Sequence, residues 1–306
     1  MNRKHTKEFM EAKAFLEEHG NSPEVVNKYI CKQKGEGADL RRAISALQAY
    51  AYSLNDEDLV SEVALLITDG KYCSGLMNKI SKITLKKYGK EIWKTIFGNM
   101  DMPEAGWTLN EMNEFTATIE QKFISVTSRD DYENTLKKGN PWVRRFKASE
   151  RKELNLNDVD GIIAKMNADF LHTLNEFCDS GQLFFNQIID DSVIKEYESG
   201  RWDIRREGTK IIFIKIPFLM TRYLNETDNQ MKRFYACHCP WARKSIMTDQ
   251  NISQSFCYCS FGHDKQGLEW AFGRELDGRV ICSVLDGNSV QCMFEADIPD
   301  DIVNAS

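Results

Sequence analysis

The stretch WDIRREGTKIIFIKIP, residues 202–217, decides the fold class. Two short runs, Trp202–Arg206 and Lys210–Ile216, are together rich in β-branched residues and are separated by Glu207-Gly208. Such runs around a tight glycine turn are typical of a β-hairpin, and Pro217 ends the second strand because it cannot donate to a ladder. Strands joined in this way pair antiparallel. The sequence therefore predicts an antiparallel sheet.

A second hairpin follows near the end of the chain. Arg279–Leu285 and Val290–Ala296 flank Asp286-Gly287-Asn288. Between the two hairpins the pattern predicts further strands at Arg233–Cys239 and Gln254–Cys259, and helices at Phe218–Leu224, Pro240–Met247 and Lys265–Phe272, the last ending at Gly273. Helices packed on an antiparallel sheet define an α+β fold.

Upstream of the first hairpin the apolar residues recur at helical spacing. One long helix is predicted at Val159–Cys178, and residues 5–150 are predicted to form six or seven helices. The polar segment 140–161 interrupts this pattern and is the candidate boundary. We therefore expect a helical N-terminal region, residues 1–150, and an α+β ligand-binding domain, residues 151–306.

Composition limits the class of protein. The 306 residues are 42% hydrophobic and 28% charged, as in a globular protein, and the net charge of −6 argues against a nucleic-acid partner. The N-terminal stretch MNRKHTKEFMEAKAFLEEHG is charged throughout, so we expect no signal peptide, no membrane partner and a cytoplasmic location. A homo-oligomer stays open as an alternative.

Two Cys-x-Cys pairs carry the candidate chemistry. They lie in YACHCPW, residues 235–241, and in FCYCSFGHD, residues 256–264, of a chain with nine cysteines. A disulfide framework is disfavoured because the number is odd and a cytoplasmic compartment is reducing. Three interpretations stay open, namely packing or pocket lining, a metal site, and a reactive thiol.

The metal interpretation uses the period of a strand. Residues i and i+2 share one face, so Cys237 with Cys239, and Cys257 with Cys259, would present four thiols. Zinc is the cofactor that such a set would hold. Its sulfur ligands lie roughly 3.8 Å apart, which an extended Cys-x-Cys reaches only by bending its side chains inward. The zinc signal is therefore weaker than that of paired Cys-x-x-Cys turns.

The other two interpretations use the neighbouring residues. Pro240 predicts a helix that begins directly after Cys239, whose dipole would favour a thiolate there. Cys239 or Cys259 would then be a catalytic nucleophile, with His238 or His263 as its base. In the pocket interpretation the cysteines behave as small hydrophobic residues. The expected ligand-binding residues are Cys237, Cys257, Arg233, Tyr235, Trp241, Tyr258 and Cys292.

At these residues the chain resembles a family of uncharacterised bacterial proteins. The resemblance rests on KIPFLMTRYLNETDNQMKRFYACHCPWARKSI, SFCYCSFGHDKQGLEWAFGREL and VICSVLDGNSVQCMFEADIP. This C-terminal part, roughly residues 170–300, is similar to the L-2-amino-thiazoline-4-carboxylic acid hydrolase-like proteins and to the 4-vinyl reductase small-molecule-binding domain. The resemblance implies an α+β fold with a ligand cavity.

Those related families carry a cysteine in a Ser-Val-Leu-x-Gly-Asp-x-x-Cys-x-Phe pattern. Cys292 matches it with one extra preceding residue, whereas Asn288 replaces the aspartate, which argues against a direct transfer of hydrolase chemistry. We expect a small-molecule ligand in a cysteine-lined pocket. The alternatives are a hydrolase or thiol-dependent enzyme that acts on a small amide or heterocycle, and a structural zinc-binding interaction module.

Overall fold

The computed structural model describes most of the chain. The described residues run from 7 to 303, except 55, 57–58, 60–62, 64–73, 104–106, 108, 140–153, 156–157, 181–183, 185–188 and 249–250. They form two compact units, Met1–Asn78 with Met100–Met112, and Lys79–Asn99 with Asn113–Ser306. The predicted boundary segment, residues 140–161, lies largely outside the described residues.

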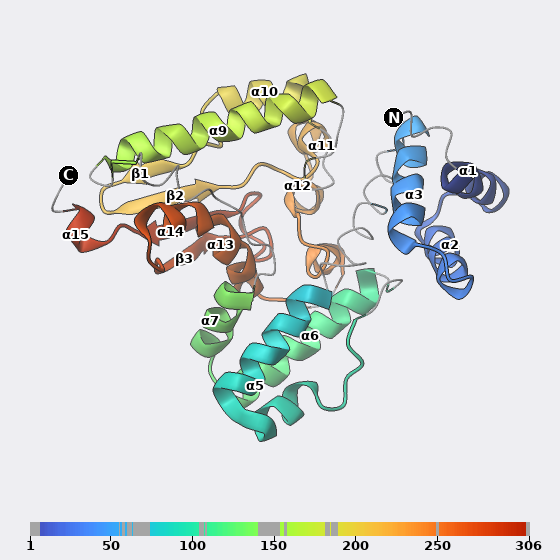
Figure 1. The fold of residues 1–306 in the computed structure, drawn as a ribbon, viewed down its shortest axis with the longest axis horizontal. Helices are drawn as coiled ribbons and strands as arrows, with labels where there is room; N and C mark the ends of the chain where they lie inside the picture. The colour runs from blue at the N-terminus through green and yellow to red at the C-terminus, as the bar shows by residue number, and fades with distance from the viewer. Residues whose placement is uncertain are drawn as a thin grey trace. The chain divides into compact units, whose positions relative to one another are not determined.

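The first unit is helical (Figure 1). Its described helices are α1 (Lys7–His19), α2 (Pro23–Gly35) and α3 (Leu40–Leu54). Each helix buries one apolar stripe, and the three stripes meet in a core that includes Leu16, Ile30 and Leu47, all at most 1% exposed. The helical N-terminal region predicted from the sequence is confirmed.

The second unit contains the remaining elements. Its helices and 3₁₀-helices, including two whose first turns belong to the first unit, are α5 (Ser74–Phe97), α6 (Leu109–Val126), α7 (Arg129–Gly139), α9 (Val159–Ser180), α10 (Asp191–Glu198), α11 (Met220–Asn225), α12 (Asn229–Ala236), η3 (Arg243–Met247), η4 (Gln254–Cys257), α13 (Tyr258–Asp264), α14 (Gln266–Phe272) and α15 (Asp300–Val303). The strands are β1 (Arg205–Glu207), β2 (Lys210–Ile214), β3 (Gly278–Cys282) and β4 (Met293–Asp297).

The four strands form one antiparallel sheet in the order β1-β2-β4-β3. Both predicted hairpins are present, and β2 joins them by pairing with β4 so that Phe213 lies opposite Phe294. These two rings lie on the face that α13 and α14 cover, where Phe261 contacts Phe294 at 6.0 Å between ring centroids. The predicted α+β class with an antiparallel sheet and packed helices is confirmed.

The long helix α9 runs beside β1 (Figure 1). Asn167 fixes this contact, because its side chain donates to the carbonyl of Ile204 at 2.8 Å and accepts from the Ile204 N–H at 3.0 Å. The predicted helix Val159–Cys178 is confirmed and extends to Ser180. The predicted helices at Phe218–Leu224 and Lys265–Phe272 correspond to α11 and α14, and Gly273 ends α14 with φ 72°.

Two predicted strands are wrong. Arg233–Cys239 is the end of helix α12 followed by extended chain, and Gln254–Cys259 is the 3₁₀-helix η4 leading into α13. Neither stretch contains a β-branched residue, and each helix has its own cap. The Asp228 side chain accepts from the Met231 N–H at 2.8 Å, and the Ser253 side chain accepts from the Ser255 N–H at 3.2 Å.

The predicted helix Pro240–Met247 is confirmed only in its second half. A turn occupies 240–242, with the Arg243 N–H donating to the Cys239 carbonyl at 2.8 Å, and the 3₁₀-helix η3 follows. The Asn113 side chain of α6 binds this segment from both sides, because it donates to the Pro240 carbonyl at 3.0 Å and accepts from the Ser245 N–H at 2.8 Å. Helix α6 therefore fixes the chain directly after Cys239.

Helix α7 holds the second Cys-x-Cys segment. Its backbone approaches α13 so closely that a Cβ on Gly262 would lie 2.2 Å from the Lys137 carbonyl oxygen. Nearby, the buried Glu120 of α6 accepts hydrogen bonds from the N–H and hydroxyl of Ser253, and burial raises its pKa.

No helix within the described ranges is long and apolar enough to cross a membrane.

Candidate functional site

The structure gathers five of the cysteines. Cys237 and Cys239 lie in the extended chain after α12, Cys257 ends η4, Cys259 lies in α13, and Cys292 directly precedes β4. A thiolate on Cys237 or Cys259 would raise the pKa of Cys239, and one on Cys292 or Cys237 would raise the pKa of Cys257. The five side chains are therefore neighbours, and we call them the cysteine cluster.

Burial determines the protonation of this cluster. It raises the pKa of Cys239 and Cys257 well above the ordinary value, raises that of Cys237, and raises that of Cys292 to about 12. The N–H groups of Trp241 and Ala242 point at the Cys239 sulfur and oppose this shift, but desolvation is the larger effect. These four thiols are therefore protonated at neutral pH, whereas the sequence suggested that a following helix would favour a thiolate at Cys239.

The helical conformation of the second pair changes its geometry. Residues i and i+2 of a helix point about 200° apart, so Cys257 and Cys259 do not share a face as they would on a strand. Cys257 packs with the core of the sheet, and its sulfur lies 3.0 Å from the Ser283 hydroxyl. The described residues contain no group of three or more His, Cys, Asp or Glu side chains placed to hold a metal ion.

The two candidate bases have other partners. The Nε2 of His238 lies 2.7 Å from the Ile216 carbonyl oxygen, which makes it the protonated nitrogen, and the ring contacts Phe218 edge-on. Burial lowers the pKa of His238 to about 3, with the charge of Lys215 next in effect. His263 places Nδ1 3.2 Å from the Asp264 carboxylate. Neither contact points a histidine nitrogen at Cys239.

The cysteine cluster nevertheless keeps accessible surface. Cys237 and Cys259 are buried, but Cys239, Cys257 and Cys292 are each only partly buried. The thiols of these three residues are strongly desolvated although the residues keep some accessible surface. Tyr132 of α7 lies beside the cysteine cluster. Burial raises the pKa of its hydroxyl, and thiolates on Cys259, Cys239 or Cys257 would raise that pKa further.

The aromatic candidates serve mainly as supports. Trp241 is 1% exposed and contacts Phe115 of α6 at 6.2 Å between ring centroids. Tyr258 lies under the ammonium of Lys137, which is 5.1 Å from its ring centroid. Tyr235 is half-buried with the Arg222 guanidinium 5.6 Å from its ring. These contacts tie the two Cys-x-Cys segments to α6, α7 and α11.

Cationic side chains surround the first cysteine pair. The charges that act most strongly on the Cys237 thiol are those of Arg243, Lys215 and Arg233, and each opposes the effect of burial on its pKa. Arg243 is fully buried, donates from Nε to the Phe234 carbonyl at 2.8 Å, and has its guanidinium 4.1 Å from the Phe234 ring centroid. The site is therefore apolar in its thiols and positive at its border.

A polar group lies beside the cluster. The Lys215 ammonium donates to the Ser260 hydroxyl at 2.8 Å and lies 3.5 Å from the Asp264 carboxylate. The Lys215 N–H also donates to the Cys292 carbonyl at 3.1 Å, which ties this group to the cysteine cluster. Neither Lys215 nor Ser260 is among the site residues that the sequence predicts. The available signal was a lysine at the end of an apolar strand, with Ser260 and Asp264 one helical turn apart.

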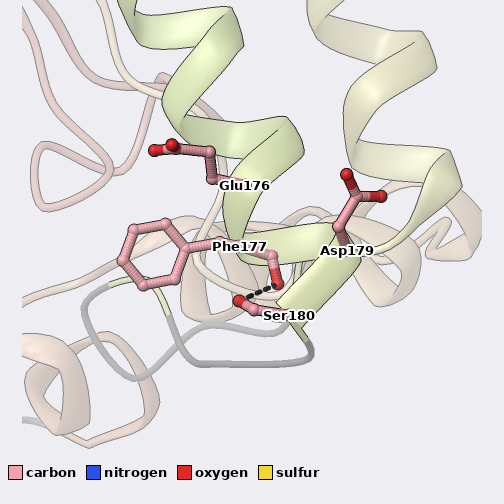
Figure 2. Close-up of a pocket in the computed structure, with 4 residues that line it drawn as sticks. All are labelled: Glu176, Phe177, Asp179 and Ser180. Atoms are coloured by element: carbon pink, nitrogen blue, oxygen red, sulfur yellow. Dashed lines mark hydrogen bonds between the residues drawn. The ribbon is translucent and has the colours of Figure 1, made fainter.

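A separate pocket lies at the end of α9. It is lined by Glu176, Phe177, Asp179 and Ser180, and Figure 2 shows the Ser180 hydroxyl bonded to the carbonyl of Phe177. Both charged side chains are acidic and point away from each other (Figure 2). None of the predicted site residues lines this pocket.

Comparison with known proteins gives no further assignment. No family model, no curated protein and no solved structure matches this chain.

Proposed function

We propose that this protein is a cytoplasmic protein that binds a small molecule at the cysteine cluster. The observation that carries the proposal is that Cys239, Cys257 and Cys292 are strongly desolvated yet keep accessible surface. A recess lined by protonated thiols offers an apolar contact surface with few hydrogen-bond demands. An apolar portion of a ligand would fill it.

Raised thiol pKa values favour binding over covalent catalysis. A cysteine nucleophile needs a stabilised thiolate, whereas burial works in the opposite direction at Cys237, Cys239, Cys257 and Cys292. His238, the adjacent base candidate, donates its Nε2 proton to a backbone carbonyl. The small-molecule-binding domain that the sequence resembles is in keeping with this role.

The proposal is tested with N-phenyl-1-naphthylamine, an uncharged probe whose fluorescence rises in apolar sites. Cys292→Phe adds a ring where the recess lies, so we expect its affinity for the probe to fall at least about tenfold, equivalent to about 1.4 kcal/mol. The matched control is Cys31→Phe, because Cys31 is exposed on α2. Cys239→Leu serves as a second variant if Cys292→Phe does not fold.

Equal probe affinities of the folded variants and the wild-type protein would overturn the proposal. So would the absence of probe binding to the wild-type protein. Circular dichroism and the thermal midpoint of each variant establish that the native fold is compared.

A further inference from the structure

We propose that the guanidinium of Arg233 binds an anionic group of the ligand, such as a carboxylate, at the border of the cysteine cluster. This inference rests on the proposed function, since it names the chemistry of the molecule bound there. The ligand is thereby an amphipathic organic anion, with its apolar part on the thiols.

The position of Arg233 is fixed by one hydrogen bond. Its Nε donates to the Val284 carbonyl at 2.6 Å, which joins α12 to the loop between β3 and β4. The Nη1 atom faces Gly287, whose φ is 86° and where an added Cβ would lie 4.0 Å away. Gly287 itself places no side chain over this end of the guanidinium, and Arg233 is only partly buried.

The acidic residue of this loop, Asp286, is engaged by backbone N–H groups. The Asp286 carboxylate accepts from the N–H groups of Ser283 at 3.3 Å, Asn288 at 2.7 Å and Ser289 at 3.1 Å. Within the described residues the Arg233 side chain forms no ion pair, and its one hydrogen bond is the one to the Val284 carbonyl. Its two Nη groups therefore stay available as a planar pair of donors, which matches a carboxylate.

The surrounding charge favours an anion. Lys215 and Arg243 act on the same thiol as Arg233, so three cations adjoin Cys237. Lys215 has its own carboxylate partner in Asp264, 3.5 Å away, so the charge that an anionic ligand would match is that of Arg233. Half-buried positive charge is unfavourable without a partner, and an anionic ligand would supply that partner.

The test compares two probes that differ by one sulfonate. 8-Anilinonaphthalene-1-sulfonate is N-phenyl-1-naphthylamine with an added anionic group. We expect Arg233→Gln to lower the affinity for the sulfonate probe at least about tenfold and the affinity for the uncharged probe less than about twofold. Arg233→Lys, which keeps the charge but loses the fork of donors, is expected to lie between the two.

The control is Lys195→Gln, which makes the same charge change on an exposed residue of α10. Equal effects of Arg233→Gln on both probes, or no effect on either, would overturn the inference while leaving the apolar recess supported by the uncharged probe. Failure of both probes to bind the wild-type protein overturns the proposed function itself, and this inference with it. A higher salt concentration should lower the affinity for the sulfonate probe and leave the affinity for the uncharged probe unchanged.

Discussion

At the scale of single residues, desolvation decides what the cysteines can do. Two backbone N–H groups point at the Cys239 sulfur, which is the arrangement that lowers a thiol pKa at the start of a helix. The loss of hydration on burial has a larger effect on the pKa of Cys239 than these two N–H groups have, so the pKa rises instead. A sequence motif cannot reveal this balance, because the burial of Cys239 depends on how the folded chain packs around it and not on its neighbours in the sequence.

This balance predicts slow alkylation. With native protein and iodoacetamide at pH 7, we expect the exposed Cys31 to be labelled at least about 100-fold faster than Cys239, Cys257 and Cys292, because the reacting species is the thiolate. Peptide mass spectrometry measures each rate. In denaturant the difference should vanish, and labelling of native Cys239 at the rate of Cys31 would contradict the assignment of protonated thiols.

At the scale of elements, local signals that belong to turns and caps were readable in the sequence. Gly208 and Gly287 each lie in a predicted hairpin connection and have positive φ, and Gly273 ends α14 as predicted. The strand predictions at Arg233–Cys239 and Gln254–Cys259 are wrong because the caps Asp228 and Ser253 begin helical segments there. The packing of α13 on α7 had no readable signal, since nothing local in FCYCSFGHD identifies the partner of Gly262.

That packing contact yields a prediction for Gly262. Gly262→Ala places a Cβ within 2.2 Å of the Lys137 carbonyl oxygen and 2.8 Å of its carbon, both backbone atoms that cannot rotate away. We expect a loss of about 1–3 kcal/mol in the free energy of unfolding, measured by chemical denaturation.

Gly35→Ala is the matched control for this change. Gly35 also lies in a helix, and an added Cβ there has no atom within 4 Å, so we expect no loss of stability. If Gly262→Ala were as stable as the wild-type protein, that result would contradict the close approach of the α7 and α13 backbones.

At the scale of the whole molecule, the sequence predicted the architecture better than the site. The α+β class follows from two hairpins that each form locally, and their joining through β2 and β4 completes the sheet. The site needs segments near residues 132, 215, 237, 257 and 292 to meet, which is a property of tertiary packing. Cys292 connects two hydrophobic cores of the second unit, since it packs against both.

The burial of His238 makes the stability of the second unit sensitive to acid. Its pKa is lowered from 6.5 to about 3, chiefly by desolvation, so the unfolded chain binds a proton between these values that the folded chain does not. Stability from this group is therefore full above about pH 6.5 and is lost as pH falls toward 3, by roughly 4–5 kcal/mol in total.

His238→Asn keeps a donor for the Ile216 carbonyl and cannot titrate. Its urea midpoint should fall less steeply than that of the wild-type protein between pH 6.5 and 4, whereas His172→Asn, at a side chain 74% exposed on α9, should reproduce the wild-type profile. Parallel profiles for His238→Asn and the wild-type protein would mean that His238 is charged or solvated in the fold, and that the first cysteine pair lies nearer to water than its contacts indicate.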